Sequence, residues 1–509
     1  MLDLFLIIVL VSLPFVFVLA GLPWIHHRRA SFLRQRAPRL IGILFLVALA
    51  SCRSPIYRGT SINRGPTPGR ARENVHPVSL SHHALSPTPT ALQSTDWPTY
   101  HHDNSRTGYL PNEPDPNQLA AAWTTKLGNA VYAEPLVIGE RVIVATEGDN
   151  LYSLDARTGQ VQWRTNIGQP VPVSALPCGN IDPLGITGTP VYDPATGLVF
   201  AVGEVTGPEH LLVGVDLNTG KLRVQRVVNA PGMPPQIYQQ RAALALSHGM
   251  VYVAYGGLSG ECENYHGAVV ASQTDGKGPL LSYVVPSEVE AGIWGPSGPA
   301  IDNQGQVYVA TGDDTHITGK WDLSNAVLRL SPTLQLEDSF APSTWRTDDT
   351  GNFDLGSEGP ALLPNGLLFI AGKSGFGYLL HANALGGIGG QAAVVKICYG
   401  LALGGVASAA SDVFVPCSDG LRRVLDAPGT TLTVDWHTSV QITLPPIVGG
   451  HTVYSLDPGG ILFALDIDTG LVRAKVSLGF AVPHFATPAL SQGRIFVGMT
   501  VGVSAVTLA

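Results

Sequence analysis

The sequence has few charged residues and no strongly basic region in its main part. Asp, Glu, Lys and Arg make up only 13% of the 509 residues, and 38 acidic residues outnumber 30 basic ones, for a net charge of −8. Binding to nucleic acid requires a concentrated positive field opposite the phosphates. We therefore expect no nucleic-acid partner.

Long helical patterns are also scarce. The chain contains 58 Gly and 39 Pro, about a fifth of all residues, a composition typical of many short strands joined by turns. Its 45% of hydrophobic residues is enough to bury a large core. This combination predicts an all-β chain, folded as one large domain or as two to three ordinary ones.

Only five cysteines occur, none of them adjacent, and no Cys-x-x-Cys-His motif is present. This excludes a covalently attached c-type haem, so any electron acceptor would be a separate protein.

The N-terminus predicts export. The basic stretch 26–39 precedes the apolar run "IGILFLVALA" (41–50), and "LASC" (49–52) follows. This ending resembles a bacterial lipoprotein lipobox, which would make Cys52 the lipidated first residue of the mature protein. A second apolar run, 2–25, is long enough to span a bilayer. Either the true start lies downstream of it, or the two runs form an uncleaved hairpin. In both cases we expect residues 53 onward to lie on the extracytoplasmic side of the cell membrane.

Three regions follow from composition. Residues 1–52 form the membrane segment and signal, and residues 53–95 form a tether rich in Pro, Ser and Thr that we expect to be disordered. Residues 96–509 form the folded domain.

Within residues 96–509 one unit recurs: an entry strand, a strand after a turn, a third strand ending near Leu-Asp, a Thr-Gly turn and a fourth strand. We count eight such units, spaced by roughly 40 to 60 residues, as in propeller blades. Their second strands are 141–146, 198–203, 250–255, 306–311, 367–372, 412–417, 452–457 and 494–499.

The eighth unit ends after three strands, whereas residues 119–128 form a strand that precedes the first unit. Placing this early strand beside the last three closes the ring and removes two open sheet edges. The sequence therefore predicts an eight-bladed β-propeller closed by an N-terminal strand. The Trp residues of the fourth strands (Trp123, Trp163 and Trp436) are expected to wedge between blades.

The repeat L-D-x-x-T-G-x-x-x-W, seen at 154–163, resembles that of the pyrroloquinoline-quinone-type β-propellers, and 96–109 is similar to the segment that leads into such domains. The family includes quinone-dependent dehydrogenases and propellers without a cofactor. In the enzymes a quinone and Ca²⁺ lie at the hub. The resemblance implies that Asp313, just after a Thr-Gly pair, is a Ca²⁺ ligand and that Lys373 contacts the quinone oxygens.

The resemblance is incomplete at two positions. Where the enzymes have a second acidic ligand, this chain has Cys262, and strand alternation would point the neighbouring Glu261 and Glu263 away from the site unless a loop relaxes it. Where the repeat would place an aspartate base, the chain has Ser331. The carboxylates that could replace this base are Asp314, Asp322, Asp354 and Glu358. Many alcohol-oxidising members have a disulfide between two adjacent cysteines, and this chain has no adjacent cysteines.

The other cysteines suit an oxidising compartment. Cys398 and Cys417 could pair across neighbouring strands, and Cys178 and Cys262, in loops of adjacent blades, could also pair.

Two functions remain in competition at this stage. The favoured hypothesis is a non-catalytic scaffold whose funnel binds a protein, peptide or glycan. The alternative is a pyrroloquinoline-quinone- and Ca²⁺-dependent dehydrogenase that oxidises an alcohol or sugar, with Lys373 and Asp313 at the quinone.

Overall fold

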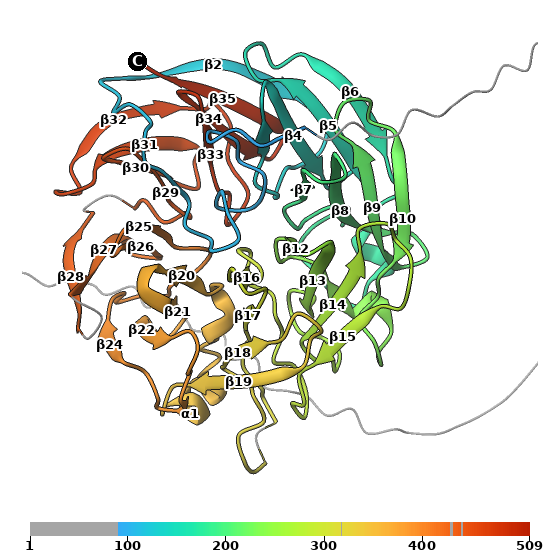
Figure 1. Ribbon diagram of the computed structural model, residues 1–509, viewed down its shortest axis with the longest axis vertical. Helices are drawn as coiled ribbons and strands as arrows, with labels where there is room; N and C mark the ends of the chain where they lie inside the picture. Colours follow the sequence, from blue (N-terminus) through green and yellow to red (C-terminus); the bar gives the residue numbers. More distant parts are fainter. Residues whose placement is uncertain (1–89, 317, 428–430, 439–440) are drawn as a thin grey trace, which may run out of the picture. The chain divides into compact units, whose positions relative to one another are not determined.

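The computed structural model describes residues 90–509, except 317, 428–430 and 439–440. Eight antiparallel sheets are arranged around a central axis like the blades of a propeller (Figure 1). The predicted all-β, eight-bladed architecture is confirmed. The strands of each blade follow one another from the hub to the rim, so the first strand of each blade faces the axis.

The bounds of the strands in the first four blades are as follows. Blade 1 is β3 (Leu136–Ile138), β4 (Arg141–Thr146), β5 (Asn150–Asp155) and β6 (Val161–Asn166). Blade 2 is β7 (Val191–Asp193), β8 (Leu198–Val205), β9 (Glu209–Asp216) and β10 (Leu222–Val227). Blade 3 is β12 (Ala245–Ser247), β13 (Met250–Gly257), β14 (Ala268–Gln273) and β15 (Leu281–Val284), with the short β11 (Tyr238–Gln239) also paired to β13. Blade 4 is β16 (Ala300–Ile301), β17 (Val307–Ala310), β18 (Val327–Leu330) and β19 (Leu336–Ala341), with β23 (Gly387–Ile388) at its edge.

The second half of the ring repeats the pattern. Blade 5 is β20 (Ala361–Leu363), β21 (Leu367–Ala371), β22 (Phe376–His381) and β24 (Ala393–Lys396). Blade 6 is β25 (Ala407–Ala409), β26 (Asp412–Cys417), β27 (Gly420–Ala427) and β28 (Thr431–His437). Blade 7 is β29 (Ile447–Gly449), β30 (Thr452–Leu456), β31 (Ile461–Asp466) and β32 (Val472–Ser477), with β1 (Tyr109–Leu110) inside it. Blade 8 is β33 (Ala489–Ser491), β34 (Arg494–Met499), β35 (Gly502–Leu508) and β2 (Leu119–Lys126). The helix α1 (Trp345–Gly351) and the 3-10 turns η1 (Val173–Ala175), η2 (Pro235–Ile237), η3 (Leu355–Ser357) and η4 (Pro364–Gly366) lie in the connections.

The ring closes as the sequence predicts. Strand β2 pairs antiparallel with β35 from Leu119 opposite Leu508 to Lys126 opposite Gly502, and Trp123 faces Ala505. Figure 1 shows the blue β2 alongside the red β35. Blade 8 therefore combines both ends of the folded domain and has no missing strand.

The Trp residues of the outer strands join neighbouring blades. The indole N–H groups of Trp123, Trp163 and Trp436 donate to the backbone oxygens of Ala156, Leu217 and Ile467, each in the next blade. Each indole also covers the Gly of the next blade's Asp-x-x-Thr-Gly turn, where a Cβ would come within 3.0 Å of the ring. These glycines also have φ near +70°, which disfavours other residues. The repeat motif therefore encodes contacts between blades.

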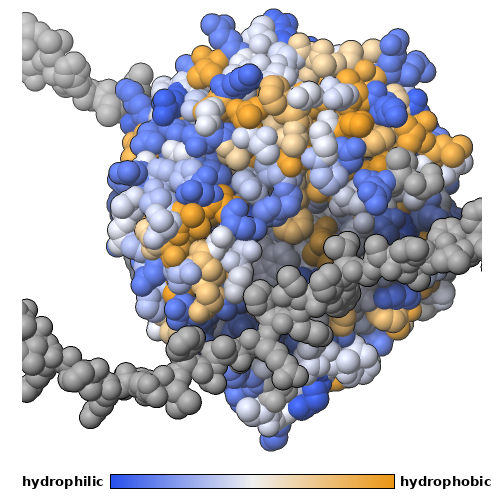
Figure 2. Space-filling model, turned by 180° about the vertical axis from the view of Figure 1, so that it is seen from behind, coloured by the Kyte–Doolittle hydropathy of each residue, from blue (hydrophilic) through white to orange (hydrophobic). Residues whose placement is uncertain are grey.

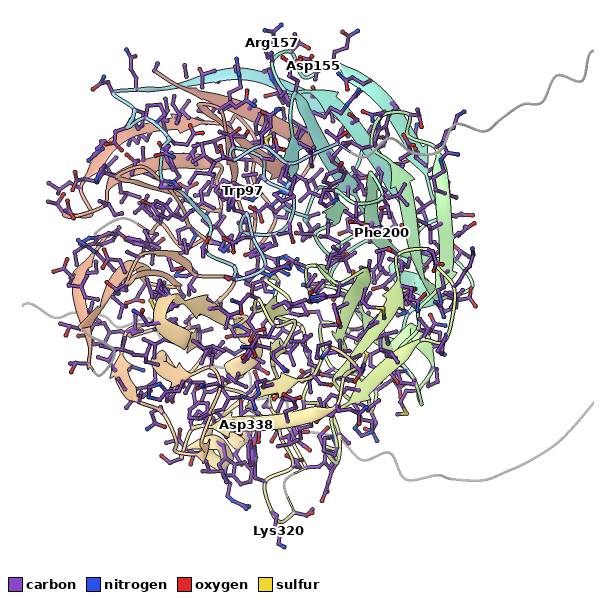
Figure 3. All side chains as sticks on the ribbon, in the orientation of Figure 1. Trp97, Asp155, Arg157, Phe200, Lys320 and Asp338 are labelled. Carbon is purple, nitrogen blue, oxygen red and sulfur yellow. A yellow bond between two sulfur atoms is a disulfide. The ribbon has the colours of Figure 1, made fainter. Side chains whose placement is uncertain are left out.

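A hub segment, residues 96–113, crosses one end of the central axis. Trp97 is fully buried at the inner side of the ring, whereas Asp155 lies at its outer edge (Figure 3). The hub segment makes a hydrogen bond with every blade in chain order. From blade 1 to blade 8, the bonds are Trp97 N to Val137 O, Tyr192 N to Pro98 O, Asn104 Nδ2 to Leu246 O, Ile301 N to Asn104 O, Leu362 N to Ser105 O, Ser408 N to Thr107 O, Val448 N to Gly108 O and Gly493 N to Glu113 Oε2.

The opposite side of the propeller is shown in Figure 2, where hydrophobic residues are scattered among hydrophilic ones. Cys52, the apolar runs 2–25 and 41–50, and residues 53–89 of the tether lie outside the described residues. In the part of the chain that the structure describes, none of the helices has the length and apolar character needed to cross a membrane.

Candidate functional site

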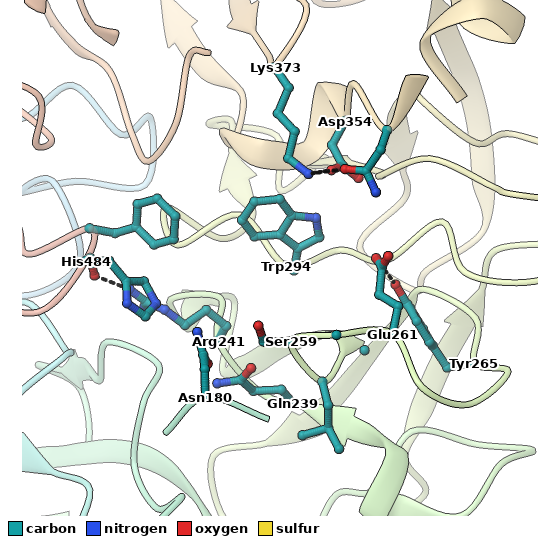
Figure 4. A pocket seen from close by; sticks show the side chains of 15 residues that line it. Asn180, Gln239, Arg241, Ser259, Glu261, Tyr265, Trp294, Asp354, Lys373 and His484 are labelled. Atoms are coloured by element: carbon teal, nitrogen blue, oxygen red, sulfur yellow. Dashed lines mark hydrogen bonds and ion pairs between the residues drawn. The ribbon is translucent and has the colours of Figure 1, made fainter. Parts of the chain in front are cut away.

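A cavity of about 340 Å³ opens at the hub. Its walls come from the loops of blades 2 to 5 and from the connection between blades 7 and 8 (Figure 4). The lining residues are Asn180, Gln239, Arg241, Gly257, Leu258, Ser259, Gly260, Glu261, Tyr265, Trp294, Asn352, Asp354, Lys373, His484 and Phe485. The cavity therefore combines an indole, two basic side chains, two carboxylates and three carboxamides in one space.

Lys373 follows strand β21 and projects into this cavity. Its backbone N–H donates to Asp354 O, and its Nζ makes an ion pair with the Asp354 carboxylate. The same Nζ donates to Asn352 Oδ1 at 2.8 Å and lies 5.5 Å from the centre of the Trp294 ring. The structure thus places Lys373 beside an aromatic face in the pocket.

Asp313 lies directly behind Asp354. Its backbone N–H donates to Asp354 Oδ1 at 3.0 Å, and the two carboxyl groups are hydrogen-bonded to each other. Burial and the Asp354 charge raise the pKa of Asp313 to about 9, so Asp313 carries the shared proton. Burial would also raise the pKa of Asp354, but the bond from Asp313 and the charge of Lys373 outweigh it and hold this pKa below its usual value. Asp354 is therefore the ionised member of the pair.

Glu261 occupies the pocket in spite of its place next to Cys262. Its backbone adopts a left-handed conformation, with φ of 44°, which breaks the strand alternation that would otherwise turn the side chain away. Tyr265 Oη donates to Glu261 Oε1 at 3.2 Å. Burial, followed by the charges of Asp354 and Glu290, raises the pKa of Glu261. Strand alternation does not apply to Glu261, because the residue lies in the loop between β13 and β14, the exception that the sequence left open.

Cys262 occupies the position of the enzymes' second acidic ligand, but its sulfur is bonded to Cys178 in a disulfide. This bond joins the loop that carries Asn180 to the loop that carries Glu261, and both residues line the cavity. A second disulfide joins Cys398 to Cys417, both of them buried, between blades 5 and 6.

The other carboxylates and Ser331 lie outside the cavity. Asp314 accepts hydrogen bonds from the backbone of Glu288 and Val289 and braces the loop after β17, while Glu358 is buried on the inner side of blade 5. Ser331 lies in the turn after β18, where its Oγ accepts from the backbone of Gln335. Of the four candidates for the missing aspartate, Asp354 is the one that lines the pocket.

Several pocket residues were not predicted from the sequence. Trp294 and Arg241 lie in loops before β16 and β12, with no periodic pattern to mark them. The stretch "GIWGP" at 292–296 was a usable signal, because a glycine can mark a close approach of another part of the backbone. A Cβ at Gly295 would come within 2.9 Å of Gly356 O.

Asp354 contacts Lys373 directly, whereas Glu261 lies beside Tyr265 in the same cavity. Among the described residues, no group of three or more His, Cys, Asp or Glu side chains has the arrangement of a metal centre as it stands. Asp313 Oδ2 is nevertheless buried without a hydrogen-bond partner. An oxygen in this state suits a hard cation as a ligand.

Residues 115–325 match the family model described as "Outer membrane protein assembly factor BamB", of the PQQ_2 repeat. This part of the propeller therefore matches the PQQ-like repeat family. No curated protein matches the sequence.

Solved structures share the fold of this PQQ-like propeller. The quinohemoprotein alcohol dehydrogenase ADHIIG from Pseudomonas putida HK5 is 14% identical, with a TM-score of 0.63 over 82% of this chain and 80% of that one. A europium-containing methanol dehydrogenase is 15% identical, with a TM-score of 0.63 over 81% of this chain and 91% of that one. BamB from Moraxella catarrhalis is 14% identical, with a TM-score of 0.54 over 77% of this chain and all of that one.

Disulfides persist in oxidising compartments, so the two disulfides of this PQQ-like propeller, together with its family, indicate an extracytoplasmic protein.

Proposed function

We propose that this propeller is an extracytoplasmic quinoprotein oxidoreductase, with pyrroloquinoline quinone and Ca²⁺ as the cofactors of its hub pocket. The observation that carries the proposal is the Lys373–Asp354 ion pair beside the Trp294 ring, with Asp313 bonded to Asp354 and Glu261 in the same cavity. The fold alone does not distinguish enzymes from scaffolds, so the proposal depends on this group of side chains.

The residues fit this cofactor pair in their chemistry. Trp294 offers an aromatic face for a planar ring system, and Lys373 supplies a cation for quinone oxygens. Glu261 and the unpartnered Asp313 oxygen would supply hard oxygen ligands for Ca²⁺. Glu261 would take the acidic role that Cys262, held in its disulfide, does not fill.

When bound, the quinone accepts the two electrons that leave an alcohol as it becomes a carbonyl compound. The chain contributes the groups around this reaction. Asp354 is ionised and can accept the proton of a substrate hydroxyl group, while Lys373 stabilises negative charge that develops near its Nζ. The hub segment covers the other end of the axis, so substrate enters from the pocket side.

Adding pyrroloquinoline quinone and Ca²⁺ to the purified chain is expected to give saturable quenching of tryptophan fluorescence. Replacing Lys373 by Ala should weaken quinone binding about 10- to 100-fold, because a charge-assisted bond worth about 1.5 to 3 kcal/mol is lost. Lys396→Ala is the matched control, since its Nζ donates to Ser374 O outside the cavity. Quinone binding that is absent, or equal in the Lys373→Ala and Lys396→Ala variants, would refute the proposal.

The Cys178–Cys262 disulfide is expected to support both stability and binding. A double Cys178→Ser, Cys262→Ser variant should lose about 2 to 4 kcal/mol of unfolding free energy and bind quinone more weakly, because the Asn180 and Glu261 loops are no longer joined. The Cys398→Ser, Cys417→Ser variant serves as control in urea unfolding and fluorescence titration. It should lose stability but keep quinone affinity; equal affinity in both double variants would contradict the role of the first bond.

A non-catalytic scaffold is the second candidate. The match of residues 115–325 to the BamB family model favours it. In that case the funnel binds a protein, peptide or glycan, and the quinone experiment gives no saturable signal. For both functions we propose that residues 96–509 are held at the membrane by the N-terminal region, through a lipid on Cys52 or through an uncleaved helix.

A further inference from the structure

Arg241 is a buried cation with very few partners. Only 5% of the residue is exposed, and its Nε is buried without an acceptor. Its recorded hydrogen bond runs from Nη2 to His484 O over 3.4 Å, near the upper limit for such a bond. Among residues 90–509 as described, no carboxylate forms an ion pair with it, and the buried Glu147 acts on its charge only from further away. A guanidinium has five N–H donors, so most of them have no acceptor among these residues.

Arg106 shows how the same fold satisfies a structural arginine. It is equally buried, but its guanidinium donates to Pro299 O, Thr99 Oγ1, Tyr100 O and Leu244 O at 2.8 to 3.1 Å. The contrast means that burial alone does not explain the lack of partners at Arg241. Leaving a buried charge unpaired is strongly unfavourable, so this arrangement suits an anion that binds from outside.

Aromatic rings pack against the guanidinium group of Arg241, and its N–H donors remain available for a ligand. The guanidinium carbon lies 5.8 Å from the centre of the Tyr132 ring and 5.5 Å from that of Phe485. Cation–π contacts fix the plane of the group without using its N–H donors. Figure 4 shows Arg241 across Trp294 from Lys373, next to the carboxamides of Asn180 and Gln239.

The two basic side chains of the cavity therefore differ in state. Lys373 is already paired with Asp354, whereas Arg241 makes no ion pair in the described residues and feels the charge of the buried Glu147 only from further away. The planar fork of an arginine matches a carboxylate with two parallel hydrogen bonds, and neutral carboxamides nearby can donate to the same anion.

We propose that Arg241 is the carboxylate subsite of this pocket and that the substrate is a small carboxylate-bearing molecule, such as a hydroxy acid. This inference rests on the proposed function and deepens it, since it names the substrate class of the same cavity. Pyrroloquinoline quinone also bears carboxylates, so the test separates the two sources of the anion.

Benzoate and benzamide are matched probes that differ in charge but hardly in shape. In calorimetric titration of the purified full chain without quinone or Ca²⁺, benzoate is expected to bind at least about tenfold more tightly than benzamide. Arg241→Gln should weaken benzoate binding about 10- to 100-fold, and Arg241→Lys less, because the charge remains without the fork. Arg226→Gln, which loses a half-buried arginine bonded to Lys277 O and Gly278 O outside the cavity, should have no effect.

Equal binding of benzoate and benzamide, or full benzoate affinity in Arg241→Gln, would overturn the inference. If that variant does not fold, the wild-type comparison and Arg241→Lys decide. In a second titration with quinone and Ca²⁺ present, undiminished benzoate binding supports a substrate carboxylate, whereas displacement of benzoate by quinone overturns it. If quinone fails to bind while benzoate still requires Arg241, the proposed redox function fails and the carboxylate subsite stands.

Discussion

Replacing Arg106 by Leu is expected to lower the free energy of unfolding by about 3 to 5 kcal/mol. The change leaves four buried oxygen acceptors without their donor, among them Pro299 O and Leu244 O in neighbouring blades. Burial lowers the pKa of Arg106 to about 10, so the group is still charged at neutral pH and its bonds are charge-assisted. Urea unfolding followed by circular dichroism measures the effect.

The control for this prediction is Arg157→Leu. Arg157 is exposed in a turn at the rim (Figure 3), so its loss should change stability by less than about 0.5 kcal/mol. The hub segment would not fasten the blades as described if Arg106→Leu unfolded at the same urea concentration as the wild-type chain.

Replacing Asp354 by Asn is expected to lower kcat for quinone-dependent oxidation by about 10² to 10⁴, the usual contribution of a general base. Asn cannot accept the hydroxyl proton, and it also removes the charge that pairs with Lys373. Dye-linked oxidation of ethanol and of mandelate, with quinone and Ca²⁺ added, measures the loss. Quinone binding by the same variant, followed by fluorescence, shows whether the cofactor is retained.

Glu358→Gln is the matched control for Asp354→Asn. Glu358 lies four residues further along the chain, is fully buried and does not line the cavity. Burial raises its pKa to about 8, so the side chain is neutral at pH 7 and Gln has nearly the same shape. Activity should stay within a few-fold of the wild type. Full activity in Asp354→Asn, or an equal loss of activity in Glu358→Gln, would show that Asp354 is not the general base.

The blades could be predicted from sequence because their determinants are local. Each strand shows its own pattern, and the Asp-x-x-Thr-Gly turn recurs with the same bonds, as in Asp155, whose Oδ1 accepts from the Thr158 backbone and hydroxyl. The closing strand could be predicted because the last unit lacks a fourth strand and residues 119–128 form a strand that belongs to no other unit.

The site could be predicted only in part from the sequence, because most of the residues that line the cavity lie in loops. Lys373 and Asp313 each follow the second strand of a blade, and the resemblance to the quinone-dependent enzymes singled them out. Glu261 reaches the pocket because its own backbone is left-handed and its loop is joined by a disulfide to another blade. Arg241 stands out only because its buried Nε has no hydrogen-bond acceptor. Both depend on contacts between distant parts of the chain, which a single sequence does not reveal.

The pairing of β2 with β35 also sets the order in which this protein can mature. The segment that begins blade 8 is made hundreds of residues before its partner, so it waits unpaired until residues 502–508 have been synthesised and exported. During that interval an exposed strand edge is available to other chains. Newly exported chains are therefore expected to be most prone to associate with one another before β2 pairs with β35.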